Sequence, residues 1–305
     1  MTKMISDLPM DLIKEIICRL PMKSVKAARL TCKTWNDLSK SEIGKVTRPT
    51  REGETMMIAV MHRHKLYLMS GFFDGVDTSI EQRGRLKFVY HVNIYRVYHY
   101  EGLLLCIMKD VTRIVVWNPY LGQTRCIKLR YYYFPPIGDM FNYSLGYEED
   151  KELCRHFKVL RFVDFFHREP EEQFFWYEMY DFDTGLWTTL DVAPHWRIYC
   201  SSGSVSLKGN SYWCAKGRSS EGFVRDHIIC FDFTRERFGP LLPLPSCVIR
   251  DRKYAYVNLS CVKEEKIAAL FRHEYASKFE IWITTKIEVE TVSWSKFLRI
   301  VRRFG

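Results

Sequence analysis

The sequence predicts a multidomain α+β chain, in which a small N-terminal helical domain at residues 1–46 precedes an all-β, propeller-like domain at residues 55–305. Three observations support this division. Apolar residues near the start recur with the period of a helix, whereas short runs of β-branched and aromatic residues alternate with turn residues from Met56 onward. A weak internal repeat in the second part favours propeller blades, with a β-sandwich as the alternative. Residues 47–54 between the parts are polar and are expected to form a linker.

The first helix is expected to begin near Pro9, because proline suits the first helical turn, where an N–H donor would be unpaired anyway. Pro21 ends this helix, and two shorter helices are expected to follow. The apolar residues of the first helix form two adjoining rows: Leu12, Ile16 and Leu20 in one, Ile13 and Ile17 in the other. A unit of about forty residues has a marginal core. One row can therefore face that core, while the other is expected to need a partner.

The same stretch resembles the F-box, on residues that are spread over its whole length: Asp7-Leu8-Pro9, Leu12-Ile13, Glu15-Ile16-Ile17, Arg19-Leu20-Pro21, Lys23-Ser24, Arg29, Cys32-Lys33 and Trp35. F-boxes dock on a Skp-family adaptor and, through it, on a cullin of a ubiquitin ligase. The resemblance implies that nine residues build or support the adaptor-binding surface: Leu8, Pro9, Leu12, Ile13, Ile16, Leu20, Pro21, Val25 and Trp35. Periodicity alone favours a different interpretation, a helical cap packed on the following domain. Ala27-Ala28 departs from the bulkier aliphatic residues of many family members.

The composition predicts a soluble intracellular protein of the cytoplasm, the nucleus or both. Charged residues interrupt the apolar ones from Lys3 onward, unlike a signal peptide, and no later apolar run approaches the length of a membrane span. The ten cysteines occur singly and never as a CxxC pair, which favours free thiols in a reducing compartment. The net charge of +10 is dispersed along the chain, so a nucleic-acid partner is disfavoured.

Four copies of a hairpin repeat organise the second part of the chain, at residues 114–127, 177–187, 228–238 and 279–294. Each copy is an apolar strand that ends near an aromatic residue, a short polar turn and a second strand. Glycine-led strands at residues 102–106 and 209–213 precede two of the copies, which gives at least three strands to a unit. Four tryptophans occupy comparable strand positions and are expected to be largely buried: Trp117, Trp187, Trp213 and Trp282.

The order of these segments also resembles the plant F-box-associated interaction domain, which is kelch-like. The motifs that carry this resemblance lie after Tyr100 and include Val116-Trp117-Asn118-Pro119, Leu145-Gly146-Tyr147, Phe157-Lys158-Val159-Leu160-Arg161, Tyr212-Trp213, Phe231-Asp232-Phe233 and Val292-Ser293-Trp294. The resemblance implies that the β-domain holds a target protein for ubiquitination. Relatives usually continue well past Leu298, so the last blade is expected to be incomplete at its C-terminal end, with its final strands the least protected.

No motif predicts a catalytic site, a metal or a cofactor, because the nucleophile elbow, the phosphate-binding loop, the dinucleotide fingerprint and HExxH are all missing. His62 and His64 offer two local ligands, which are too few for a zinc site. Asp181 and Asp183 are expected to satisfy backbone groups in a turn, and the aromatic loop at residues 131–136 suits either an interface or packing between blades.

The leading hypothesis is therefore a non-catalytic substrate receptor of an SCF-type ubiquitin ligase. The alternative is a propeller-type sugar- or ligand-binding module or enzyme with an incidental helical cap. Clustered acidic or metal-binding residues on one face of the propeller would support that alternative. A basic nucleic-acid-binding protein is the third hypothesis, and failure to bind DNA or RNA would remove it.

Overall fold

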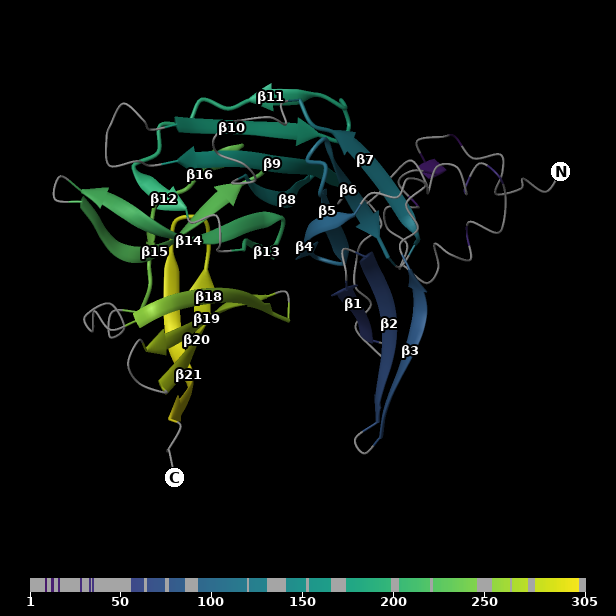
Figure 1. Ribbon diagram of the computed structural model, residues 1–305. Coiled ribbons are helices and arrows are strands. Elements are labelled where there is room, and N and C mark those ends of the chain that lie inside the picture. The colour runs from purple at the N-terminus through teal and green to yellow at the C-terminus, as the bar shows by residue number, and fades with distance from the viewer. Residues whose placement is uncertain are drawn as a thin grey trace. The chain divides into compact units, whose positions relative to one another are not determined.

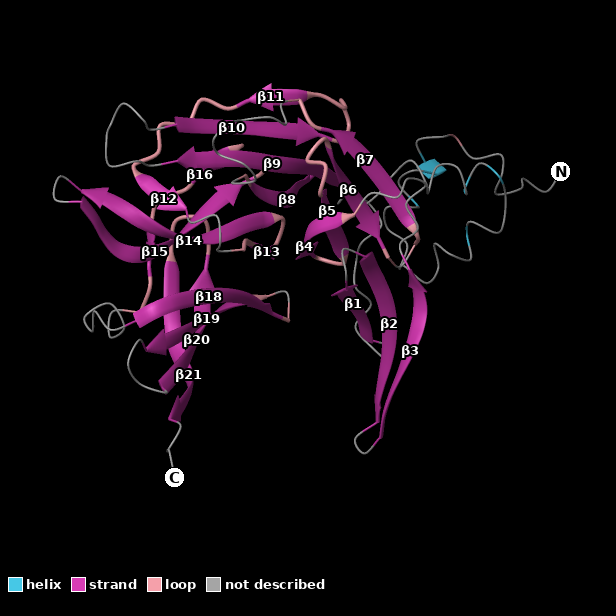
Figure 2. Cartoon of the chain, in the orientation of Figure 1, coloured by secondary structure: helices cyan, strands magenta, loops and turns pink. Residues whose placement is uncertain are grey.

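The computed structural model contains strands β1 to β21 and, near the N-terminus, a few helical positions (Figures 1 and 2). The residues that it describes are 9, 12–13, 16, 28, 33, 35, 56–62, 65–74, 77–85, 93–119, 121–130, 141–151, 154–165, 174–198, 203–219, 222–245, 254–263, 265–273 and 278–301. The chain forms two compact units: Met1–Asp139 with Asp150–Arg155, and Met140–Glu149 with His156–Gly305. Among the described residues, no helix has the length and apolar character needed to cross a membrane.

The first unit contains two antiparallel sheets. The strands of one, in the order β1-β2-β3, are β1 (Met56–His62), β2 (Lys65–Asp74) and β3 (Asp77–Arg85). The strands of the other, in the order β4-β5-β6-β7, are β4 (Ile94–Tyr100), β5 (Leu103–Met108), β6 (Arg113–Asn118) and β7 (Gln123–Lys128). Leu66 of β2 packs with buried side chains of the second sheet, namely Ile94, Leu104, Cys106, Met108, Val115 and Trp117.

The second unit contains three antiparallel sheets. The first, in the order β11-β10-β9-β8, consists of β8 (Asn142–Glu149), β9 (Arg155–Phe165), β10 (Phe174–Asp181) and β11 (Trp187–Thr189). The second has the order β12-β14-β15-β16, with β13 beside β14 and β17 beside β15: β12 (Trp196–Ile198), β13 (Val205–Leu207), β14 (Asn210–Ser219), β15 (Gly222–Asp232), β16 (Arg237–Phe238) and β17 (Leu242–Pro243). The last, in sequence order, consists of β18 (Tyr254–Val262), β19 (Lys266–His273), β20 (Lys278–Ile287) and β21 (Val292–Val301).

A shared turn chemistry explains why the repeats form hairpins. Asn118, Asp181 and Asp232 each end the first strand of a hairpin, and their side-chain oxygens accept hydrogen bonds from backbone N–H groups two or three residues ahead. Oδ1 of Asp181, for example, accepts from the amides of Asp183 at 2.7 Å and Thr184 at 2.8 Å. Short polar side chains of this kind favour tight turns. The predicted turn role of Asp181 is thereby confirmed.

The strand registers confirm the four predicted hairpins. Trp117 pairs with Thr124, Tyr180 with Trp187, and Phe231 with Phe238, while β20 and β21 pair over most of their length. Both predicted glycine-led strands also form, as β5 and β14. The glycines before them, Gly102 and Gly209, have φ angles of +85° and +80°, a conformation that side chains disfavour.

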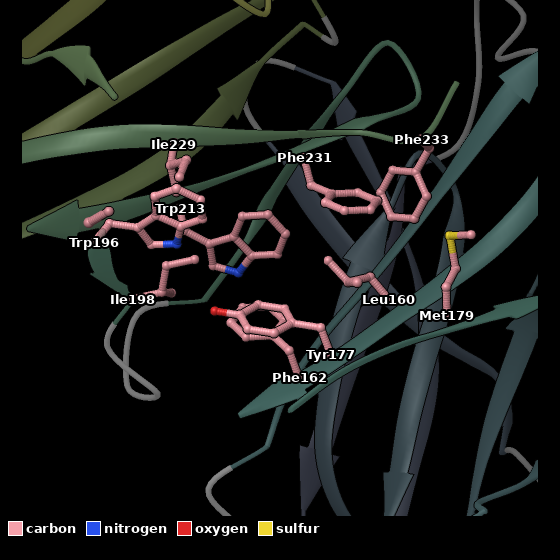
Figure 3. Packing of buried hydrophobic residues seen from close by; sticks show 11 residues of the cluster. Leu160, Phe162, Tyr177, Met179, Trp196, Ile198, Trp213, Ile229, Phe231 and Phe233 are labelled. Atoms are coloured by element: carbon pink, nitrogen blue, oxygen red, sulfur yellow. The ribbon is translucent and has the colours of Figure 1, made fainter. Parts of the chain in front are cut away.

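The core of the second unit lies between the β8–β11 sheet and the β12–β17 sheet (Figure 3). Phe162 stacks on Tyr177 with ring centroids 5.2 Å apart, and the Trp213 ring meets Phe162 edge-on at 5.5 Å. The buried members of this cluster are Leu160, Phe162, Tyr177, Met179, Trp196, Ile198, Trp213, Ala215, Ile229, Phe231 and Phe233. Aromatic pairs in such geometries add to the stabilisation from burial alone.

The tryptophan prediction holds at two of its four positions. Trp117 and Trp213 are 4% and 1% exposed, as expected for side chains that lie between sheets. It holds only in part for Trp187 and Trp282, which are partly rather than fully buried. Trp187 begins the three-residue edge strand β11, and Trp282 packs at the margin of its cluster, where the Lys296 ammonium lies 5.0 Å from the ring centroid.

Candidate docking surfaces

The first helix presents one apolar side chain outward beside another that is buried. The Ile13 amide donates to the Pro9 carbonyl at 3.1 Å, which is the i to i−4 bond of a helical turn. Ile13 is 1% exposed, whereas the adjacent Leu12 is 46% exposed. Ile16, in the same predicted row as Leu12, is half-buried. Leu12 therefore offers apolar surface that the described part of the chain does not cover.

The other residues predicted for the adaptor surface are placed unevenly. Trp35 is helical and 6% exposed, which suits a supporting role in the helical core, and Pro9 is exposed. Leu8, Leu20, Pro21 and Val25 lie outside the described residues. The aromatic loop at residues 131–136, His64 and the side chain of His62 also lie outside them.

Buried charges in the second unit form structural junctions between its strands. Lys158 Nζ on β9 donates to Glu236 at 2.7 Å and Glu148 at 3.1 Å, and its side chain is 7% exposed. Burial lowers the pKa of Lys158, but hydrogen bonds to these two carboxylates raise it by more, so its pKa lies above the ordinary value. Nζ also lies 3.4 Å from the Phe233 carbonyl. Lys158 thus ties β9 to β8 and to the turn after β15.

A second junction pairs Arg161 of β9 with Glu178 of β10. The two residues face each other in the strand register, their atoms are 2.7 Å apart, and both side chains are fully buried. The guanidinium carbon of Arg161 also lies 3.7 Å from the ring centroid of Phe141, in cation–π geometry. The sequence shows Arg161 only as part of a family motif, because its pairing depends on a strand register that the sequence does not display.

The third junction is Asp164, whose Oδ2 accepts from the Ile198 amide of β12 at 2.7 Å. Burial raises the pKa of Asp164 to about 7, although the hydrogen bond from Ile198 and the charge of Arg197 lower it. This carboxylate connects the β8–β11 sheet to the β12–β17 sheet. Sequence reasoning missed it because one aspartate within an apolar strand carries no motif.

The described part of the chain was searched for two kinds of reactive site, metal-binding clusters and nucleophilic cysteines. No three His, Cys, Asp or Glu side chains there are grouped so as to hold a metal ion. The described cysteines are unbridged. Burial raises the pKa values of Cys106 and Cys230 to about 12, so these thiols stay protonated and are poor nucleophiles.

A second exposed apolar surface, which sequence reasoning did not identify as a binding surface, lies on β21. Phe297, Leu298 and Ile300 are 66%, 41% and 48% exposed. The other large apolar residues found exposed among the described ones are scattered: Leu12, Met61, Tyr95 and Leu186. Apolar side chains that gather on one strand are more informative than single ones. The alternation of apolar with polar or charged residues in β21 was a signal that could have found this surface.

Antiparallel sheets that follow one another along the chain, after a few helical positions near the N-terminus, are typical of a propeller-type protein. Comparison with known proteins supports that class. Residues 56–304 match the F-box associated beta propeller domain, and residues 5–47 match the F-box domain. The chain belongs to the family of F-box proteins with an F-box-associated propeller domain.

Several of the matching relatives come from Arabidopsis thaliana. One whose given name includes the term F-box protein is 60% identical over 315 residues, which cover 99% of this chain and 76% of the relative. Another F-box protein is 58% identical, with 98% of this chain and 79% of the relative covered. An F-box/kelch-repeat protein is 56% identical, with 97% and 70% covered.

Proposed function

We propose that this chain is the substrate-recognition subunit of an SCF-type cullin ubiquitin ligase. The family membership supports such a role in general, since the F-box implies binding to a Skp-family adaptor. In this proposal the helical domain binds the adaptor and, through it, the cullin. The β-domain binds a target protein. The complex would act in the cytoplasm or the nucleus.

The receptor itself would carry out no covalent step. The buried carboxylates and thiols of the second unit hold strands together or stay protonated, as the contacts of Asp164, Glu178 and Cys230 indicate. Catalysis by this subunit would be proximity, because holding a target near the activated ubiquitin raises its effective concentration.

The proposed adaptor surface comprises the nine residues named above, and the contrast between Leu12 and Ile13 carries the proposal. Neighbouring apolar residues on one helix differ in exposure, 46% against 1%, as expected where one row packs inward and the other remains for a partner. A few well-packed, desolvated residues near the centre of an interface contribute most of its binding energy. Leu12 is therefore the described residue whose replacement should weaken the complex most without unfolding the helical domain.

The test measures binding of the full chain to a purified Skp-family adaptor by calorimetry. Leu12→Asp should weaken binding by about a hundredfold, because a carboxylate would be buried against apolar adaptor surface without a partner. Lys33→Asp, at another exposed helical position, is the matched control for a charge change and should remain within about threefold. Equal affinity for Leu12→Asp and the wild type would refute the adaptor surface.

A further inference from the structure

Among the residues that the structure describes, the last sheet, β18–β21, packs against a neighbouring sheet on one face. Trp282 and Trp294 pack with Ile228 and Leu242 of the neighbouring sheet, and the Trp294 indole N–H donates to the Pro243 carbonyl at 3.0 Å. The register shows which residues occupy the opposite face, because directly paired residues share a face. Leu270 pairs with Ile281, Ile281 with Leu298, and Phe279 with Ile300. We call the face formed by these five residues the open face.

The open face is apolar and accessible. Leu298 and Ile300 are exposed, Leu270, Phe279 and Ile281 are half-buried, and none of the five belongs to a core cluster of the described residues. Its β21 side is also a sheet edge, since β20 is the one strand paired with β21 among the described strands. An exposed apolar edge strand is a template for another strand.

The opposite side of the β21 edge carries positive charge. A register shift at Phe297 places Lys296 and Arg299 on the same side, where both approach the buried Glu280 carboxylate, at 3.4 and 3.8 Å. Lys296 and Arg299 carry two positive charges and Glu280 carries one negative charge, so this group has a net charge of one positive unit. Glu280 is the sole acidic residue in the sequences of β19, β20 and β21.

We propose that the β21 edge binds an extended segment of a target protein in which apolar and acidic side chains alternate. This inference rests on the proposed function, because it specifies how the β-domain would recognise a target. Added strands gain affinity from backbone hydrogen bonds and specificity from alternate side chains. On such a strand the apolar side chains would contact Leu298 and Ile300, and the acidic side chains would contact Lys296 and Arg299. A second copy of this chain fits poorly, since β21 against β21 would bring these cations together.

The test uses the full chain and a fluorescein-labelled peptide of about eight residues that alternates valine and glutamate. Fluorescence anisotropy should show saturable binding that weakens with added salt, since the charges are exposed. A valine–lysine peptide, and a peptide of the same composition with its valines and glutamates in two separate blocks, should each bind at least about tenfold more weakly. Equal binding of the block peptide, or no binding of the alternating peptide, overturns the proposal.

Variants locate the site. Arg299→Gln leaves Lys296 with the buried Glu280 and should weaken peptide binding about tenfold, and Leu298→Ser with Ile300→Ser should do the same. Leu186→Ser replaces a leucine that is 65% exposed on another hairpin of the same unit and should stay within about twofold. Thermal melting checks that each variant is folded. Unchanged binding by Arg299→Gln overturns the proposal even if the double variant does not fold.

Two further measurements separate this inference from its rivals. Hydrogen exchange of residues 292–300 should slow when the alternating peptide binds, and unchanged exchange there overturns strand addition. Light scattering should show a monomer, whereas a dimer that Leu298→Ser dissociates would assign the edge to a second copy and overturn the proposal. Adaptor binding of the β21 variants should equal that of the wild type. If the wild type binds the adaptor but not the alternating peptide, this inference is refuted and the proposed function stands. If the wild type does not bind the adaptor, the proposed function is refuted.

Discussion

The β8–β11 sheet and the β18–β21 sheet are both four-stranded and antiparallel, yet their surroundings differ. In β9, eight consecutive residues from Phe157 to Asp164 are buried, so both faces of that strand are covered. In β21, no residue from Val292 to Ile300 is buried. Strands buried on both faces become interior structure, while an exposed strand keeps apolar side chains available to a partner. Coverage by neighbouring sheets, rather than the hairpin itself, therefore decides which repeats keep apolar side chains accessible.

Charges follow the same division. Arg161 and Glu178 are fully buried in the β8–β11 sheet, whereas the side chains of Lys286 and Glu288 at the end of β20 are 61% and 60% exposed. A buried pair strongly destabilises the fold when one partner is removed, while an exposed pair is screened by water and contributes little. The free energy of unfolding should therefore depend on the first pair and hardly on the second.

The largest expected effect separates two tryptophans that the sequence places at comparable strand positions. Trp213→Ala should lower the free energy of unfolding by about 3–5 kcal/mol, because it empties the centre of the aromatic core in Figure 3. Trp282→Ala should cost roughly 1–2 kcal/mol, because that side chain is only half-buried and buries less apolar area. Chemical denaturation of the full chain measures both values. Equal losses would show that the two sheets do not differ in core packing.

Breaking the buried ion pair sharpens the comparison of charges. Arg161→Met should cost about 3–5 kcal/mol, because the Glu178 carboxylate would remain buried without its partner. The double change Arg161→Met with Glu178→Met should recover much of that loss, since an apolar pair needs no compensation. Lys286→Met is the matched control and should leave the melting temperature unchanged. A double variant no more stable than Arg161→Met would contradict this account of Glu178.

The pH dependence of stability tests the junction between two sheets. The pKa of Asp164 is raised from 3.8 to about 7 in the folded protein. Between these two pH values the carboxyl group is protonated in the folded protein and ionised in the unfolded chain. Stability is therefore greatest below the unfolded pKa and falls as the pH rises toward 7, by an amount on the order of a few kcal/mol. Asp164→Asn can still accept from the Ile198 amide and does not titrate.

This variant should lack that part of the pH dependence and should be more stable than the wild type at pH above 7. Denaturant midpoints of the two proteins, measured at a series of pH values, give the difference, in which the other titrating groups cancel. Parallel curves for wild type and Asp164→Asn would show that Asp164 is not the titrating group.

Local sequence patterns predicted the hairpins because their causes are local. Asp181 and Asp232 close their own turns, and the alternation around Trp117 and Trp213 identifies strands without knowledge of the neighbouring sheets. The partial exposure of Trp282 could not be predicted, because it depends on how a sheet distant in sequence covers it. The close approach at Gly146 is similar. A Cβ atom there would collide with the Phe233 ring and the Gly209 carbonyl oxygen, a contact between segments distant in sequence that no local pattern encodes.

The proposed adaptor surface shows the same limit. The two-row pattern predicted that one of Leu12 and Ile13 would face inward, but only the structure distinguishes the buried Ile13 from the exposed Leu12. Their role in adaptor binding stays a prediction. The Arg161–Glu178 pair and the Ile198 amide that binds Asp164 were beyond sequence reasoning, because strand register and sheet stacking bring together residues 17 and 34 positions apart.

The smallest expected effect is a difference in local opening rather than in global stability. Amide hydrogens of β21 should exchange at least about tenfold faster than those of β9, because β21 has one paired neighbour and exposed side chains while β9 is covered on both faces. Hydrogen exchange followed by mass spectrometry of the full chain measures both strands in one experiment, and the central strand β14 serves as a second slow reference. Leu298→Ser should leave the slow exchange of β9 unchanged, since the leucine contributes little to the core. If β21 exchanged as slowly as β14, an accessible edge would be excluded, and the contrast between the two sheets would be lost.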